Sequence, residues 1–316
     1  MAIAFGVALL GVVTLRLLAS PDGFALPLDA IEWDLRGRRA LSGVAVGASL
    51  AVAGVFLQSL LRNPLAEPAV LGLTSGAGLG VVVWIYVAYQ ATGAIVQYHA
   101  PIAPALLGSL GALAIVGGLG QRRGLIEPIT LILVGVVVSL ICGAGILFVQ
   151  HLLPDRGVAM ASRWVMGSLS DDIGMGWIVG VAGLALASTM IGAWLGPAMD
   201  AASMSEDEAR SVGVRLGALR ATLFLLAGAL SAGSVLLAGP IGFVGLVCPH
   251  IVRLVGGAAH RPLVVSSALL GGAVIVLADV GVRMIDLGAG RMPIGVLTAL
   301  IGGPVFIALL RREIRR

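Results

Sequence analysis

The sequence predicts an all-α, polytopic membrane protein with about ten transmembrane helices. Hydrophobic residues make up 59% of the 316 residues and charged residues only 11%, whereas soluble domains have roughly 45–50% and 25%. So few polar residues cannot coat a globule of this size, and lipid is the expected solvent for most of its surface. The composition therefore excludes soluble enzymes, secreted domains and disordered chains.

The count of crossings comes from charge-free stretches, because a spanning helix needs about 20 mostly apolar residues. Nine such stretches occur, and the longest contains Gly239-Pro240, a pair that interrupts a helix. Dividing that stretch at this pair gives ten crossings. The second of the two resulting segments, near 241–255, is short for a crossing. The stretches are 1–15, 40–61, 68–98, 100–121, 128–154, 173–199, 221–252, 262–278 and 292–310.

The rest of the chain predicts one transmembrane domain over residues 1–316, with three longer loops. Two of them, 20–38 and 151–172, mix polar and aromatic residues, and we expect short surface helices there. The third, 198–220, is the most charged segment of the chain. An alternative for the N-terminus is a signal peptide cut near residues 19–20, although it would lack a basic leading region.

The arginines predict a multi-pass inner-membrane protein with both termini in the cytoplasm. In that orientation twelve arginines lie inside and eight outside, which follows the positive-inside rule. Two outer clusters, 36–39 and 283–291, depart from the rule and need a separate explanation. The net charge of +4 indicates contact with anionic lipid headgroups and not with nucleic acid.

All twenty basic residues are arginine, so the chain has no lysine. A P-loop needs a lysine on the phosphates, and Schiff-base chemistry needs one as well. We therefore expect this chain to bind no ATP through a P-loop. The four histidines lack metal-ligand spacing, and no metal site or bound cofactor is expected.

Two motifs place helix breakers within apolar sequence. In RNPLAEP, Asn63-Pro64 stops a helix and Glu67-Pro68 begins the next turn, so the motif alone indicates an inside turn. GPIGFVGLVCPHIVRL, at 239–254, puts such residues at membrane depth, which is tolerated only where protein or a water-filled cavity covers the backbone. It is either a tight interhelical turn or a broken element beside a translocation path. We interpret His250, a single histidine in this motif, as a structural hydrogen-bonding residue and not as a ligand.

Two further motifs carry charge. Asp279 and Arg283 are four residues apart, so they share a helix face and can pair. An intramembrane aspartate is a functional candidate, but near the outer end a structural pair is at least as well supported. In SMSEDEARSVGV, at 203–214, Ser205 and Glu208 form a capping box and Gly213 suits the C-terminal cap. This predicts a short cytoplasmic helix, either solvated or docking a partner.

In this order the motifs resemble the permease subunits of ATP-binding-cassette (ABC) importers for vitamin B12, ferric siderophores and haem. The resemblance runs from residue 35 to 312, and the family's ten-helix subunit agrees with the ten crossings. It rests on R-x-x-R at 36–39, G-A-x-L-A-x-A-G-x-x-L-Q at 47–58, RNPLAEP, EAR-x-x-G-V at 208–214, GPIGFVGLV-x-PHI, ADV-x-x-R and PIGV-x-TA-x-IGGPVFI at 293–307.

The resemblance implies a homodimer with the translocation path along its axis. Two separate cytoplasmic ATPase subunits would hydrolyse ATP, and an extracytoplasmic binding protein would deliver the cargo. The positions assigned to ATPase coupling are Ser205, Glu206, Asp207, Glu208, Ala209, Arg210 and Gly213. The positions assigned to the pathway and its gating turn are Asn63, Pro64, Gly239, Pro240, Gly242, Pro249 and His250.

The resemblance also explains the outer arginines, because permeases of this family receive acidic residues of the binding protein there. The matching positions are Arg36, Arg39 and Arg283. Arg291 stands where the family commonly has Glu-Leu before proline, and it adds a positive charge near the docking surface. Arg36, Arg39, Arg283 and Arg291 are therefore the expected docking residues.

We expect a non-enzymatic permease subunit of an ABC importer for an iron chelate, haem or cobalamin, with the cargo left open among these. The alternative is a secondary transporter driven by an ion gradient. Such a transporter would need buried acidic residues near the midplane of the membrane. Only Asp279 comes close, and Arg283 can neutralise it. An intramembrane enzyme would need convergent catalytic pairs, which the scattered histidines and acids do not supply.

Overall fold

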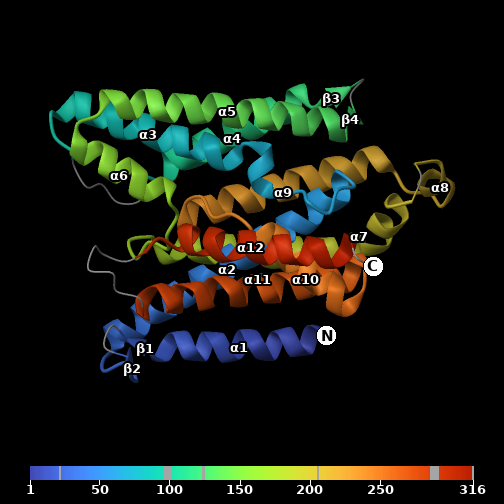
Figure 1. Cartoon of the computed structure of the whole chain (residues 1–316), viewed down its shortest axis with the longest axis horizontal. Coiled ribbons are helices and arrows are strands. Elements are labelled where there is room, and N and C mark those ends of the chain that lie inside the picture. The colour runs from blue at the N-terminus through green and yellow to red at the C-terminus, as the bar shows by residue number, and fades with distance from the viewer. Residues whose placement is uncertain (21–22, 96–100, 123–124, 205, 285–291, 315–316) are drawn as a thin grey trace.

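The computed structural model describes residues 1–20, 23–95, 101–122, 125–204, 206–284 and 292–314, and their regular structure is almost entirely helical (Figure 1). This confirms the predicted fold class. The helices are α1 (Ala2–Leu18), α2 (Ala30–Leu60), the 3₁₀ turn η1 (Pro68–Leu71), α3 (Leu73–Thr92), α4 (Ile102–Leu119), α5 (Pro128–Leu152), α6 (Asp155–Val165), α7 (Met175–Ala202), α8 (Glu206–Ser211), α9 (Leu216–Ala238), α10 (Val244–Gly256), α11 (His260–Met284) and α12 (Ile294–Ile314). Two small antiparallel hairpins pair β1 (Ala19–Ser20) with β2 (Gly23–Phe24) and β3 (Gln121–Arg122) with β4 (Leu125–Ile126).

Ten apolar helices coincide with the ten expected crossings. Within the described ranges, 7 helices are long and apolar enough to cross a membrane: α2, α3, α4, α5, α7, α9 and α11. The helices α1, α10 and α12 are apolar but offer shorter stretches. Both termini lie toward the end that carries α8, opposite α6 and the β1–β2 hairpin (Figure 1). We call these the α8 end and the α6 end; termini on one side fit an even number of crossings.

Helix α2 forms the centre of the molecule. Its 31 residues span about 46 Å. Along its apolar stretch of 18 residues, 89% is buried inside the protein, against 17% for the corresponding stretch of α5. The helices α7, α9, α10 and α11 pack around it. Gly47 of α2 meets Gly271 of α11 so closely that a Cβ on either would overlap the other's carbonyl group. Small residues allow this backbone contact where larger ones would separate the helices.

The expected short surface helix within 20–38 is wrong. The chain instead forms the β1–β2 hairpin and then enters α2 at Ala30, which continues unbroken to Leu60. Two ion pairs at i,i+4 spacing support the first turns of α2, Glu32–Arg36 at 3.1 Å and Asp34–Arg38 at 2.7 Å. The expectation for the other outer loop is confirmed, since α6 lies within 151–172.

Candidate functional site

The chain breaks between α9 and α10 at the expected position. Helix α9 ends at Ala238, Gly239 adopts a φ of 65°, and α10 begins at Val244. A Cβ on Gly239 would lie 2.8 Å from the carbonyl oxygen of Trp164, so both the backbone angle and the space require glycine. The amide of Gly295 donates to the carbonyl of Gly167 at 3.1 Å, which brings the start of α12 to the same place.

Helix α10 is too short to span a bilayer by itself. Its 13 residues extend about 20 Å, whereas the hydrocarbon core is about 30 Å thick. Pro249 and His250 both lie inside it and are buried. The His250 ring stands edge-on to Phe306 of α12, with 6.2 Å between ring centroids. The short crossing expected near 241–255 is thus a half-length helix packed within the protein.

The RNPLAEP turn stops α2 by local hydrogen bonds. After Leu60, the Asn63 amide donates to the carbonyl of Gln58 at 3.1 Å, and the Asn63 side-chain oxygen accepts from the Leu65 amide at 2.9 Å. Pro64 has no amide hydrogen with which to continue the helix. The structure therefore confirms the predicted helix-breaking turn.

The same turn anchors the start of α10, which sequence reasoning did not foresee. The Gln58 side-chain amide donates to the carbonyls of Ala66 and Gly245, at 3.3 and 3.1 Å. The Glu67 carboxylate accepts a hydrogen bond from the backbone amide of Phe243. A carboxylate beside a helix N-terminus also meets the positive end of the helix dipole. The two breaker motifs therefore form one site; their role in cargo passage stays a prediction.

A cluster of buried charges joins α1, α2 and α11 near the α6 end. Asp279 is 1% exposed, and its carboxylate accepts from Arg16 Nε at 2.5 Å and from Arg39 Nε at 2.9 Å. Arg39 also donates to Asp171, at 2.7 Å. The expected partner, Arg283, is farther from Asp279, at 3.9 Å. Sequence reasoning missed Arg16 and Asp171, although a single arginine near the end of an apolar run was a signal.

Two of the docking arginines that the sequence suggested, Arg36 and Arg39, do not stand free on the surface. Arg36 is buried and donates to the carbonyls of Leu17 and Ala25 at 2.9 and 2.8 Å, while Arg39 is held in the charge cluster. Burial of a guanidinium is stable only with such partners. Arg291 lies outside the described residues. Docking at these positions stays a prediction, and for Arg36 and Arg39 it would have to compete with bonds already made.

The helix α8 is tied to the spanning helix α9. The Glu206 carboxylate accepts from Arg220 of α9 at 2.5 Å, and Arg210 also reaches it, at 3.4 Å. The hydrogen bond from Arg220 holds the pKa of Glu206 below its ordinary value. Ala209 is fully buried on the inner side of this helix.

The end of α8 has the expected glycine cap. Gly213 adopts a φ of 85°, and its amide donates to Arg210 while that of Val214 donates to Ala209, both at 3.0 Å. Asp207 and Glu208 belong to the first turn of α8. Ser205 lies outside the described residues, so the capping box stays a prediction. Residues 206–214 thus form a small, firmly attached surface on the α8 end.

Metal-ligating side chains do not gather anywhere in the part of the chain that the structure describes, with no group of three or more His, Cys, Asp or Glu placed to hold an ion. Cys142 and Cys248 are both buried and unbridged. The features that stand out are therefore backbone breaks, buried ion pairs and the α8 surface.

Comparison with known proteins identifies the family. Residues 4–312 match the FecCD transport family. The vitamin B12 import system permease protein BtuC of Yersinia enterocolitica is 38% identical over 283 residues, covering 89% of this chain and 81% of that protein. The BtuC protein of Vibrio cholerae is 35% identical over 286 residues, covering 90% and 83%.

A solved structure shows the same fold. It is an inward-facing metal-chelate type ABC transporter, 28% identical, with a TM-score of 0.84 over 98% of each chain. The sequence match spans all the helices that build the site, and the structural match extends over nearly the whole chain. On these grounds the chain belongs to the FecCD transport family.

Proposed function

We propose that this chain is the permease subunit of an ABC importer that carries a corrinoid or an iron chelate into the cytoplasm. The observation that carries the proposal is the family match over residues 4–312, joined by relatives that are vitamin B12 permeases. The relatives' cargo supports cobalamin as one candidate, beside ferric siderophores and haem.

The chain itself catalyses no reaction in this proposal. Because it has no lysine, it has no P-loop, and separate ATPase subunits supply the energy. Their docking surface is α8 with Gly213. A force on Glu206 would pass directly to α9 through Arg220, since the two side chains are bonded.

The α8 end faces the cytoplasm and the α6 end faces the binding protein in this arrangement, with the chain in the inner membrane. Two copies form the complex, and the sparsely buried helix α5 is available for lipid or for the second copy. Arg283 and Arg291 contribute to docking of the binding protein, while Arg36 and Arg39 stabilise the structure that carries the docking surface. The backbone break at 239–243 and the turn at 62–68 flank the path.

The main competing function is an ion-gradient-driven carrier, and the structure gives it little support. Such a carrier needs an acidic side chain free to bind and release a cation. Asp279, the candidate from the sequence, is instead bonded to both Arg16 and Arg39. A carboxylate held between two arginines cannot exchange a cation readily.

Transport in proteoliposomes tests the proposal. The chain is purified with its ATPase subunits, reconstituted, and supplied with binding protein and labelled cyanocobalamin, ferric siderophore or haemin. We expect uptake of one of these that requires ATP hydrolysis and is insensitive to ionophores. Uptake driven by an imposed ion gradient without ATP, or by the chain without ATPase subunits, would contradict the proposal.

A further inference from the structure

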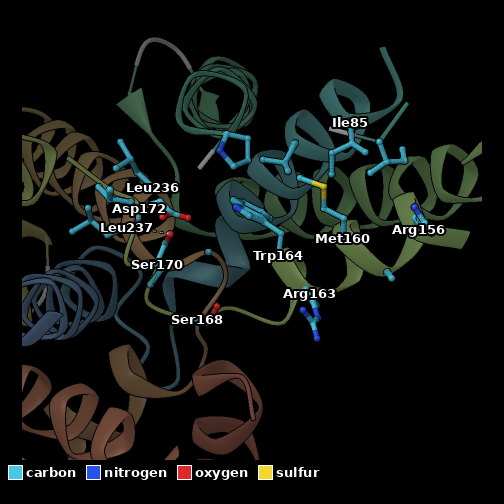
Figure 2. Close-up of a pocket in the computed structure, with 17 residues that line it drawn as sticks. Ile85, Arg156, Met160, Arg163, Trp164, Ser168, Ser170, Asp172, Leu236 and Leu237 are labelled. Atoms are coloured by element: carbon cyan, nitrogen blue, oxygen red, sulfur yellow. Dashed lines mark hydrogen bonds between the residues drawn. The ribbon is translucent and has the colours of Figure 1, made fainter. Parts of the chain in front are cut away.

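A cavity of about 580 Å³ opens at the α6 end, between α3, α6 and the last turn of α9 (Figure 2). One part of its wall is apolar and comes from Ile85, Leu236 and Leu237. Trp164 and Met160 of α6 add an aromatic and a soft, adaptable surface in the middle of the lining. A volume of this size suits a small organic ligand.

Two arginines of α6 give the cavity its charge. Arg156 and Arg163 both line it and are both exposed. They are seven residues apart, which is nearly two helical turns, so they project from one side of α6 about 10 Å apart. The cavity therefore presents two separated cationic groups along one edge.

These two arginines differ from the other described arginines of the α6 end. Arg16, Arg36, Arg38 and Arg39 each pair with a carboxylate of this chain. Arg156 and Arg163 make no ion pair or hydrogen bond with any residue in the described ranges. Their charge is available to a ligand, whereas the charge of the others is already neutralised.

The far side of the cavity is different in character. Asp172 lies there with Ser170, and the Asp172 amide donates to the Ser170 hydroxyl at 3.3 Å, next to Leu236 and Leu237 (Figure 2). Ser168 adds another hydroxyl to the lining. The cavity thus has a cationic edge, an apolar and aromatic middle, and an opposite edge that carries the Asp172 carboxylate and serine hydroxyls.

We propose that this cavity is a cargo-binding site selective for an anionic metal chelate over a neutral one. The anionic groups pair with Arg156 and Arg163, and the apolar body of the chelate packs on Trp164 and Met160. The inference rests on the proposed function and narrows its cargo class. Charge-assisted bonds to guanidinium groups supply the preference, because a neutral chelate would leave both arginines without a counter-charge.

A matched pair of probes tests this selectivity directly. Ferric tris-catecholate is anionic and ferric tris-hydroxamate is neutral, and both carry iron in six oxygen ligands. Binding is measured on the full chain in nanodiscs, without ATP or binding protein. We expect roughly tenfold or greater preference for the tris-catecholate, equivalent to about 1.4 kcal/mol, and weakening with added salt.

Variants assign the preference to the two arginines. R156Q/R163Q should lose most of it, R156K/R163K should retain much of it, and W164A should weaken both iron probes. R38Q is the control, since Arg38 is paired with Asp34 and lies outside the lining. Equal binding of the anionic and neutral probes, or an unchanged preference in R156Q/R163Q, would overturn the proposal.

The outcomes separate this inference from the function on which it rests. If ATP-driven uptake fails for every chelate, the proposed function is wrong, whatever the binding data show. If uptake works but neutral probes bind as well as anionic ones, only the cavity assignment is wrong. A loss of affinity for the binding protein in R156Q/R163Q, with chelate binding unchanged, would assign these arginines to protein docking and overturn their role in cargo binding.

Discussion

Arg39 Nε donates to Asp279 Oδ1 at 2.9 Å and so joins α2 to α11 across 240 positions of sequence. The carboxylate also holds Arg16, at 2.5 Å. One buried aspartate therefore bonds two buried arginines, and Asp171 gives Arg39 a second carboxylate partner, so these side chains depend on one another.

Removing that carboxylate should destabilise the protein strongly. In Asp279→Asn the Arg16 guanidinium loses its carboxylate partner and stays buried, while Arg39 keeps only Asp171. Breaking a buried pair in this way costs about 3–5 kcal/mol. Thermal unfolding in detergent measures the loss. The control is Asp34→Asn, whose partner Arg38 is partly exposed and whose removal should cost about 0–1 kcal/mol. Equal stability of the two variants would show that the cluster is not a structural unit.

Substitutions at Glu67 should act on α10 and not on the fold as a whole. Glu67→Ala leaves the partly buried amide of Phe243 without its acceptor, at a cost of about 1–3 kcal/mol, whereas Glu67→Gln keeps an oxygen that can accept. Hydrogen exchange of the α10 amides should rise in the alanine variant and change little in the glutamine variant. Equal exchange in both variants and the parent would contradict the anchoring role.

Two glycines of the broken segment should respond differently to alanine. Gly239→Ala combines a φ of 65° with a Cβ placed 2.8 Å from the Trp164 carbonyl oxygen, so we expect a loss of more than ~1 kcal/mol and reduced transport. At Gly242 the nearest atom is Glu67 Oε1, at 3.6 Å, which is ordinary contact. Gly242→Ala should therefore be tolerated. Paired melting curves and uptake rates check both, and the reverse order of effects would refute the assignment.

The tie between α8 and α9 should weaken in acid. Because the folded-state pKa of Glu206 is lowered, its ion pair with Arg220 is complete above the ordinary glutamate value and disappears as pH falls through the lowered one. Glu206→Gln should mimic acid at neutral pH, with faster hydrogen exchange in α8 and no change in α2. If the parent and the variant exchange alike at neutral pH, the bond does not hold the helix.

ATP-driven transport should depend on the same tie. We expect Glu206→Gln, and the double change Glu208→Gly with Ala209→Gly, to fold normally but to lose cargo-stimulated ATP turnover. ATPase assays on the assembled complex measure this, with Asp34→Asn as the control because Asp34 lies in α2 at the α6 end, away from α8, and pairs there with Arg38. Normal stimulation in the double variant would remove α8 from the coupling pathway.

Features set by neighbouring residues could be predicted from the sequence. Gly239-Pro240 ends α9 and Gly213 caps α8, where glycine accepts a positive φ, so both boundaries agreed with the structure. The pair is not a stop at every position, because Gly196-Pro197 and Gly303-Pro304 lie within α7 and α12. The β1–β2 hairpin was missed because strands of two residues leave no periodic pattern. Asx and proline chemistry likewise predicted the turn after α2.

Features set by helix packing could not be predicted. The i,i+4 rule paired Asp279 with Arg283, but the fold brings in Arg16, from 263 positions away, at a shorter distance. Arg36 and Arg39 looked exposed because charged residues usually are. Only the packing of α1 and α11 against α2 shows that they are buried, and only the full fold shows that Arg156 and Arg163 keep their charge available.

The glycine contact between α2 and α11 has a mechanical consequence. Gly47 lies eight residues beyond Arg39, and Gly271 eight before Asp279, so the helices are pinned at two points about 12 Å apart. Two rods pinned twice can neither slide nor roll against each other. Helices α2 and α11 should therefore move together as one rigid body. Any conformational change of the molecule must then occur where other elements move relative to this pair.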